Sequence, residues 1–234
     1  MLDIIDILEK GLVIDNKEKK IGVYYPSELP YCVRKTYYSY KSKPKYDLFT
    51  YKTFAIGNGL HYMIQNALIA YSTMYDDLKV NVEESIKQTS ETRLILDNEI
   101  ELHGRPDVFL VNTKTGERYV IEIKSHGNLD YLKEAEDKHL MQLNFYLNFF
   151  RDAKGILLYV NKAKLDKSKP IEKYEHFRVY QDITFNEDLL EKLKERAKEL
   201  HQSLKEDKVP RAEAKEIGEM WQCLNCPFKN ICKV

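Results

Sequence analysis

One stretch restricts what this chain can fold into more than any other: ELHGRPDVFLVNTKTGERYVIEIKSHG, residues 101–127. Its apolar residues are largely β-branched and fall into two short runs, 107–112 and 118–125, which predict two neighbouring β-strands. The NTKTGE segment between the runs is rich in turn-forming residues, so it predicts that the two strands form a hairpin. Charged residues interrupt both runs. Because burying a charge costs free energy, charged residues in strands that bury their apolar residues call for an explanation.

Strand geometry places these charges together. Side chains alternate between the two faces of a strand, so Ile121 and Ile123 are expected to point into the core while Glu122 and Lys124 share the other face. Asp107 follows a Gly-Arg-Pro and begins the neighbouring strand, from which it can reach the same side. The sequence therefore predicts two carboxylates and one ammonium group close together on one sheet face.

Two readings of this charge group are open. Two carboxylates about 4 Å apart repel each other by roughly 4 kcal/mol at an effective dielectric constant of about 20, and one lysine offsets only part of that energy. A divalent cation offsets it better, and hard carboxylate oxygens suit Mg²⁺ or Mn²⁺. The alternative is an ordinary Glu–Lys pair on a solvated strand face, which the short pattern alone does not exclude.

The rest of the chain predicts an α/β protein with a mixed sheet. Helices are expected over residues 1–10, 30–40, 53–70, 132–150 and 187–206. Extended segments are expected over 21–25, 79–88, 92–103, 155–161 and 176–182, and the tail after Pro210 is expected to be loop-like until Trp221.

Composition indicates a soluble globular protein. The 234 residues are enough for one substantial core, and 43% of them are hydrophobic against 32% charged. The 37 basic and 37 acidic side chains balance, which argues against a polycation but leaves room for a local basic groove. No apolar run is long enough to span a membrane, and the N-terminus lacks the basic start of a signal peptide. A cytoplasmic protein without membrane contact is expected.

The pattern Gly104-x-x-Asp107 followed by Glu122-x-Lys124 resembles the PD-(D/E)xK nucleases. The resemblance implies a restriction-endonuclease-like mixed sheet flanked by helices. It also implies that Asp107 and Glu122 hold Mg²⁺ or Mn²⁺ and that Lys124 positions or polarises the attacking water.

Three further residues make the resemblance more specific. Gln142 and Tyr146 in QLNFY lie four residues apart on one helix face and resemble the Q-x-x-x-Y motif of the RecB-like branch, which helps to position DNA. His61, on an earlier helix, corresponds to the histidine that completes the metal site in that branch. Taken singly, a helical tyrosine is more often a core residue and a lone histidine more often structural. His103 and His126 are given no role.

The chain has only four cysteines, and three of them lie in its last twelve residues. They are Cys32 and the C-x2-C-x5-C set Cys223, Cys226 and Cys232. Four thiolates with none to spare predict one tetrahedral zinc site or one cluster, although buried free thiols are also possible. The arrangement resembles that of the iron–sulfur RecB-like nucleases, which implies a 4Fe–4S cluster that ties the two chain ends together as a structural staple.

This resemblance, with PSELPYCVRKTYY around Cys32, extends to the CRISPR-associated exonuclease family (the fourth Cas family). It implies three parts: an N-terminal helical segment over 1–52 with the first cysteine, a nuclease core over 53–206, and a cysteine segment over 207–234. These segments are expected to be joined at the four-cysteine cluster.

The resemblance further implies a metal-dependent DNA exonuclease that acts on single-stranded DNA or DNA ends, 5′ to 3′. Its role would be CRISPR spacer acquisition, a part of antiviral defence, with an integrase complex as partner. Arg34, Lys35 and the basic connector 41–45 are expected to contact phosphates of the substrate, and the tyrosines of TYYSY to stack on bases. Three other functions stay open: a stand-alone repair or recombination nuclease, a metal-stapled DNA-binding module, and an interaction subunit with a vestigial site. The sequence leaves the oligomeric state open.

Overall fold

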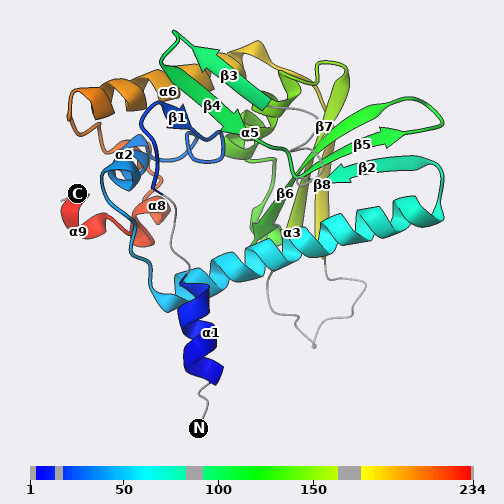
Figure 1. Ribbon diagram of the computed structural model, residues 1–234, viewed down its shortest axis with the longest axis horizontal. Helices are drawn as coiled ribbons and strands as arrows, with labels where there is room; N and C mark the ends of the chain where they lie inside the picture. The colour runs from blue at the N-terminus through cyan, green and yellow to red at the C-terminus, as the bar shows by residue number, and fades with distance from the viewer. Residues whose placement is uncertain (1–3, 14–17, 83–91, 163–174, 233–234) are drawn as a thin grey trace. The chain divides into compact units, whose positions relative to one another are not determined.

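The computed structural model describes residues 4–13, 18–82, 92–162 and 175–232 (Figure 1). The helices are α1 (Ile4–Leu12), α2 (Val33–Lys41), α3 (Leu48–Met74), α5 (Asp137–Leu147), α6 (Glu187–Lys205), α7 (Glu213–Glu216), α8 (Trp221–Leu224) and α9 (Lys229–Cys232), with a 3₁₀ turn η1 (Leu129–Tyr131). The strands are β1 (Val23–Tyr24), β2 (Leu78–Val82), β3 (Thr92–Leu96), β4 (Ile100–Gly104), β5 (Val108–Asn112), β6 (Arg118–His126), β7 (Ala153–Asn161) and β8 (Phe177–Ile183). The chain is therefore α/β, as predicted.

The described residues form two compact units. One unit, called here the central unit, comprises Ile56–Thr92 and Gly104–Glu191, and the other, the terminal unit, comprises Met1–Ala55, Arg93–His103 and Lys192–Val234. The division of the chain at residues 52 and 206 that the resemblance implies stays a prediction.

The central unit is built on a five-stranded sheet in the order β2-β5-β6-β7-β8. Strands β6 and β7 run parallel, whereas the other neighbours are antiparallel, so the sheet is mixed. The predicted hairpin is confirmed: β5 and β6 are antiparallel neighbours with Val108 opposite Ile121. A mixed sheet flanked by helices is consistent with a restriction-endonuclease-like fold.

Both faces of this sheet are covered within the central unit. On one face the apolar core gathers Ile64 of α3 with Val108, Ile121, Ile123 and Val160 of the strands. Helix α5 packs against β6 and β7 (Figure 1) and buries Leu143 and Leu147 completely. Since neighbouring residues of β6 point to opposite faces, burying Ile121 and Ile123 in one layer directs Glu122 to the other.

Gly155 of β7 lets α5 approach the sheet. A Cβ at this position would lie 2.9 Å from Leu143 Cδ2, 3.1 Å from Leu147 Cδ1 and 3.2 Å from Ile183 Cβ. These distances are shorter than normal carbon–carbon contacts, so any side chain at 155 would push against two leucines of α5.

We expect Gly155→Ala to lower the free energy of unfolding by about 1–3 kcal/mol, because extra volume in a close-packed core forces its neighbours apart. Urea denaturation followed by circular dichroism measures the change. Gly59→Ala is the matched control, since nothing lies within 4 Å of the new Cβ and the position is in α3. The control is expected to gain up to about 1 kcal/mol from better helix propensity. Equal effects of the two substitutions would contradict the overpacking argument.

The terminal unit contains the three-stranded sheet β1-β4-β3, in which β1 and β4 are parallel. The prediction of a single extended segment over 92–103 is wrong, because β3 ends at Leu96 and β4 begins at Ile100. Asp97 and Asn98 between them have φ values of 51° and 59°. Asp and Asn tolerate this left-handed conformation better than other side chains, and two such residues in succession make a tight hairpin turn.

Other boundaries differ from the prediction in smaller ways. Helix α3 begins at Leu48 rather than at 53, and α5 begins at Asp137 rather than at 132. The side chain of Asn128 accepts a hydrogen bond from Asp130 N and caps η1, a separate turn that precedes α5. The tail after Pro210 is not all loop, because α7 lies within it. Strand β2 ends at Val82, and the rest of the predicted strand to residue 88 lies outside the described residues.

One arginine holds three segments of the terminal unit together. The Arg196 guanidinium donates to both carboxylate oxygens of Glu213, at 2.6 and 2.7 Å, and to the carbonyl oxygens of Leu29 and Tyr31. Both partners of the ion pair are largely buried. Burial alone would raise the pKa of Glu213, but the hydrogen bonds and charge of Arg196 outweigh it and lower that pKa.

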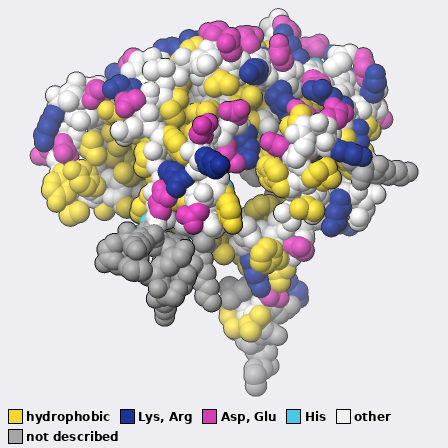
Figure 2. All heavy atoms as spheres, turned by 180° about the vertical axis from the view of Figure 1, so that it is seen from behind, with side chains coloured by type: hydrophobic (Ala, Val, Ile, Leu, Met, Phe, Trp, Pro, Cys, Tyr) yellow, Lys and Arg dark blue, Asp and Glu magenta, His cyan; other side chains and the backbone are white. Residues whose placement is uncertain are grey.

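Charges of both signs are interspersed on the face drawn in Figure 2, in keeping with the balance of 37 basic and 37 acidic residues. None of the helices in the described part of the chain is both long enough and apolar enough to cross a membrane.

Candidate active site

Glu122 lies at the centre of a hydrogen-bonded group in the central unit. Only 2% of the residue is exposed. Its Oε1 accepts hydrogen bonds from Lys124 Nζ at 2.7 Å and from Gln142 Nε2 at 2.7 Å. Its Oε2 is buried as well and has no hydrogen-bond partner among the described residues. One oxygen of a buried carboxylate is thus held in place while the other is left unsatisfied.

Gln142 of α5 links the two charged groups of β6. Its Nε2 donates to Glu122, and its Oε1 accepts from Lys124 Nζ at 2.8 Å. The same Nε2 also lies 3.2 Å from the hydroxyl of Tyr146, one helical turn further along α5. Gln142 and Tyr146 are buried, so both side chains face the carboxylate and not solvent.

Asp107, directly before β5, is held by two other elements. Its Oδ2 accepts from the backbone N–H of Ile123 at 2.7 Å, and its Oδ1 lies 3.2 Å from His61 Nδ1 on α3. Gln65, one turn after His61, donates to the carbonyl oxygen of Asp107 at 3.0 Å. Gln65 was not predicted from the sequence; it lies four residues after His61 on the same helix face, but that spacing alone does not show that it reaches Asp107.

The electrostatics follow from this crowding. Burial, and then the Asp107 carboxylate, raise the pKa of Glu122 to about 7, against the opposing effects of Lys124 and His61. Burial alone would lower the pKa of His61, but the hydrogen bond and charge of Asp107, with Glu122 behind it, outweigh burial and raise that pKa. Crowding of the two carboxylates therefore disfavours the charged form of Glu122 and favours the protonated form of His61.

The donor set fits a hard divalent cation. The candidate ligands are the carboxylates of Asp107 and Glu122 and the imidazole of His61. The buried Oε2 of Glu122, which has no partner among the described residues, costs free energy unless a cation binds it. Within the described ranges, however, no group of three or more His, Cys, Asp or Glu side chains is already arranged to hold a metal ion. The Asp107 oxygens are bonded to His61 and Ile123 instead, so a cation would have to displace the imidazole contact.

The four cysteines come together in the terminal unit. All of them line one cavity of about 50 Å³, and none forms a disulfide. Burial raises the pKa of Cys223 and of Cys226, and the neighbouring thiols add to this; at Cys226 the backbone hydrogen bond from Phe228 and the charge of Lys35 oppose it. The side chain of Gln222 accepts a hydrogen bond from Cys32 N at 3.0 Å, which joins the N-terminal cysteine to the C-terminal segment.

Arg34 also lies beside these cysteines. Its Nε donates to Pro210 O at 2.7 Å, and its Nη1 lies 3.4 Å from Cys232 O and 3.7 Å from Cys232 Sγ. The guanidinium that was predicted to contact substrate is thus engaged in joining the N-terminal and C-terminal segments of the unit. Its role toward substrate stays a prediction.

Comparison with solved structures shows the fold. The crystal structure of SSO0001 matches with a TM-score of 0.62 at 22% identity, over 98% of this chain and 96% of that one. An alkaline exonuclease (LHK-Exo) from Laribacter hongkongensis gives a TM-score of 0.42 at 11% identity, over 87% and 95% of the two chains. A phage-related exonuclease from Haemophilus somnus 129PT gives 0.36 at 13%, over 62% and 70%. A comparison with curated protein sequences gave no match.

Comparison with protein families is more decisive. Residues 45–233 match the PD-(D/E)XK nuclease superfamily, a span that includes His61, Asp107, Glu122 and Lys124. Because the match covers most of the sequence and contains the charged group described above, the chain belongs to the PD-(D/E)XK nuclease superfamily.

Proposed function

We propose that the protein is a divalent-metal-dependent deoxyribonuclease whose active site is the group around Glu122. The observation that carries the proposal is the pair of fixed contacts made by Lys124 Nζ, 2.7 Å from Glu122 Oε1 and 2.8 Å from Gln142 Oε1. These contacts hold an ammonium group beside a buried carboxylate that has one unsatisfied oxygen. Membership of a nuclease superfamily, whose members typically use Mg²⁺ or Mn²⁺, supports the same conclusion.

The residues divide the work in the following way. Asp107, Glu122 and His61 would hold the cation, which when bound supplies Lewis-acid stabilisation of charge on the scissile phosphate. Lys124 orients the attacking water and donates a hydrogen bond to it from Nζ. Gln142 holds Lys124 and Glu122 in fixed positions by hydrogen bonding to both. Tyr146, on the next turn of α5, is hydrogen-bonded to Gln142 in turn. Burial of the carboxylate strengthens each of these interactions by excluding water.

The type of cleavage and its setting are drawn from the sequence resemblance. The order of motifs, with His61 before the acidic strands and Gln142 with Tyr146 after them, favours the RecB-like branch. In that branch, we propose, the protein acts as an exonuclease on single-stranded DNA or on DNA ends, 5′ to 3′. Its role would be the trimming of DNA for CRISPR spacer acquisition in antiviral defence, together with an integrase complex in the cytoplasm.

Digestion of end-labelled DNA tests the activity. Linear single-stranded and double-stranded substrates and a closed circular single strand are incubated with Mg²⁺, with Mn²⁺ and with chelator. Wild type is expected to cut the linear strands with metal and to leave the circle intact, because an exonuclease needs an end. Asp107→Ala and Lys124→Ala are expected to be inactive or slowed roughly 10²–10⁴-fold. Equal cleavage by wild type and both variants would refute the proposed site, and binding without any cleavage would leave a DNA-binding module.

The four cysteines around the 50 Å³ cavity of the terminal unit are proposed to hold a 4Fe–4S cluster that acts as a structural staple. Their convergence from both ends of the chain supports a metal site, and four thiolates suit zinc equally well. Purification without air separates the two. A brown protein with visible absorbance indicates iron–sulfur, whereas a colourless protein with one bound zinc indicates the alternative. A colourless protein without metal would exclude both.

We expect Gln142→Ala to lower kcat roughly 10- to 100-fold with little change in KM, because losing a residue that orients the metal ligands commonly has an effect of this size. Steady-state cleavage of a labelled strand measures both constants. Gln202→Ala is the matched control, since Gln202 lies on α6 and bonds only to Glu206 among the described residues. A rise in KM at constant kcat would instead make Gln142 a substrate-binding residue.

A further inference from the structure

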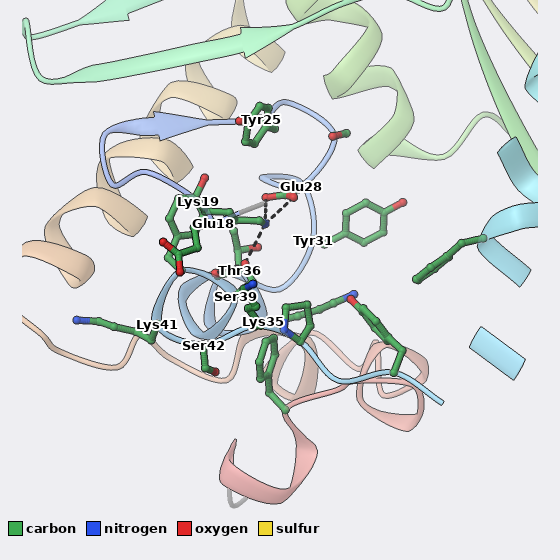
Figure 3. Close-up of a pocket in the computed structure, with 17 residues that line it drawn as sticks. Glu18, Lys19, Tyr25, Glu28, Tyr31, Lys35, Thr36, Ser39, Lys41 and Ser42 are labelled. Carbon is green, nitrogen blue, oxygen red and sulfur yellow. Dashed lines mark hydrogen bonds and ion pairs between the residues drawn. The ribbon is translucent and has the colours of Figure 1, made fainter. Parts of the chain in front are cut away.

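The terminal unit contains a second, much larger cavity than the one at the cysteines. Its volume is about 610 Å³, and it is lined by residues of segment 18–31, of helix α2 and of the segment 42–46 that follows this helix (Figure 3). This volume lies within the range of about 300–1,000 Å³ that is typical of ligand sites. None of the nuclease residues described above lines it.

The lining is cationic although the whole chain is neutral. Four lysines face two glutamates around the cavity. Lys19 is neutralised by Glu28 at 2.6 Å, and Lys41 pairs with Asp207 at 2.6 Å. Lys35, in contrast, forms no ion pair with an acidic side chain among the described residues, although it also lines the cysteine cavity, where its charge acts on Cys226. Its ammonium group is therefore not neutralised by a carboxylate and can attract an anionic ligand in the larger cavity.

Aromatic side chains make up much of the remaining wall. Tyr25 is 38% exposed and Phe54 47% exposed, and Tyr31 also lines the cavity. Tyr46 is fixed by edge-to-face contacts, with ring centroids 5.8 Å from Tyr51 and 5.1 Å from Phe54. Figure 3 shows Tyr25, Tyr31 and Lys35 around the same space, so aromatic faces and a cation are presented together.

We infer that this cavity binds a nucleotide unit of single-stranded DNA, with its base against Tyr25 and its phosphate at Lys35. An aromatic platform combined with a positive charge is the chemistry that holds unpaired bases without sequence preference. A paired base offers no free face to such a platform, so a duplex is excluded. The choice of DNA rests on the proposed function, but the binding site itself does not depend on the nuclease centre.

Binding is tested with the full chain in chelator, so that cleavage plays no part. Fluorescence anisotropy compares labelled (dT)₁₂, a labelled abasic strand of the same length and a labelled 12-bp duplex, with free dTMP as competitor. Wild type is expected to prefer (dT)₁₂ to the abasic strand. Tyr25→Leu is expected to weaken (dT)₁₂ binding at least about fivefold and to abolish that preference, whereas Tyr25→Phe retains it. Tyr75→Leu, an exposed tyrosine of the central unit, is the matched control.

Lys35→Gln tests the phosphate contact. It is expected to lower the slope of log affinity against log salt concentration by about 0.7, the value for one phosphate contact on a single strand. Lys192→Gln on the exposed face of α6 is the control and should leave the slope unchanged. Competition by dTMP at concentrations as low as those of the oligonucleotide would identify a free nucleotide, and not a strand, as the ligand and overturn the inference.

Photocrosslinking makes the test independent of whether the variants fold. A (dT)₁₂ that carries 4-thiothymidine is crosslinked to wild type and the tryptic peptides are mapped. The inference requires crosslinks in the peptide that contains Tyr25 and Tyr31. Crosslinks confined to the central unit, together with wild-type affinity in Tyr25→Leu and Lys35→Gln, overturn it while leaving the nuclease proposal standing. Loss of cleavage in Asp107→Ala with these crosslinks intact shows the two sites to be separate.

Discussion

Replacing Glu122 with glutamine is expected to slow DNA cleavage roughly 10²–10³-fold or more, because the substitution removes one of the two carboxylates that would hold the metal. The amide has the size and shape of the carboxylate, so Lys124 keeps an acceptor and the packing around α5 is unchanged. The loss is therefore chemical and not structural. Cleavage of an end-labelled strand over a range of Mg²⁺ concentrations measures it, and added Mg²⁺ should not restore the rate.

The same substitution is expected to leave the free energy of unfolding unchanged or to raise it. In wild type the buried Oε2 of Glu122 has no hydrogen-bond partner among the described residues, and burial of a carboxylate under these conditions costs free energy. Glutamine removes the cost of burying a charge, while its amide nitrogen at the Oε2 position has no new acceptor and Lys124 loses its counter-charge, so these effects largely offset one another. Urea denaturation in chelator measures the change, and Glu117→Gln, directly before β6, where the carboxylate is 42% exposed, is the control for both assays. An active Glu122→Gln variant would exclude Glu122 from the chemistry.

Arg196→Met is expected to lower the free energy of unfolding by about 3–5 kcal/mol. The substitution keeps much of the side-chain volume but leaves Glu213 buried without its partner, and an unpaired buried charge is far more costly than a lost surface pair. It also removes the donors to Leu29 O and Tyr31 O. Lys205→Met, which breaks the exposed pair with Glu99, is the control and should cost at most about 1 kcal/mol.

The effect of Arg196→Met should also depend on pH. The pKa of Glu213 is lowered in wild type, so the pair stabilises the protein above the ordinary glutamate pKa, and this contribution is lost as pH falls through the lowered value. Without the arginine, burial is left to raise the same pKa. The difference in unfolding free energy between wild type and variant should therefore be largest near neutral pH and shrink below about pH 4. A difference that is constant from pH 7 to pH 3 would show that the charge pair is not its cause.

Alternation along β6 made much of the central unit predictable. Ile121 and Ile123 are buried on the core side and Glu122 contacts Lys124 on the other, as a period of two requires. The hairpin of β5 and β6 was equally predictable from the sequence, since the turn-forming segment NTKTGE joins two apolar runs of similar length. Both features are local, because residues that are neighbours in the sequence determine them.

Features that depend on tertiary contacts were not predictable. Nothing in the sequence near Gln142 shows that its amide would be shared between Glu122 and Lys124, because that depends on how closely α5 approaches β6 and β7. Gln65 was missed for the same reason: its bond to Asp107 O requires α3 to cross the start of β5.

The turn at Asp97 and Asn98, in contrast, could have been predicted, since two residues that tolerate positive φ interrupt an apolar run there.

The missing side chain at Gly155 sets the thickness of the layer between α5 and the sheet, and this has a consequence for catalysis. Leu143 and Leu147, which a Cβ at 155 would strike, lie on the same helix as Gln142, the residue that reaches across to Glu122. A single methyl group at a position that contacts neither substrate nor metal would therefore lift the helix and draw the amide away from the carboxylate. A glycine in the strand beside β6 thus fixes how closely α5 approaches the sheet, and with it the position of Gln142 relative to Glu122.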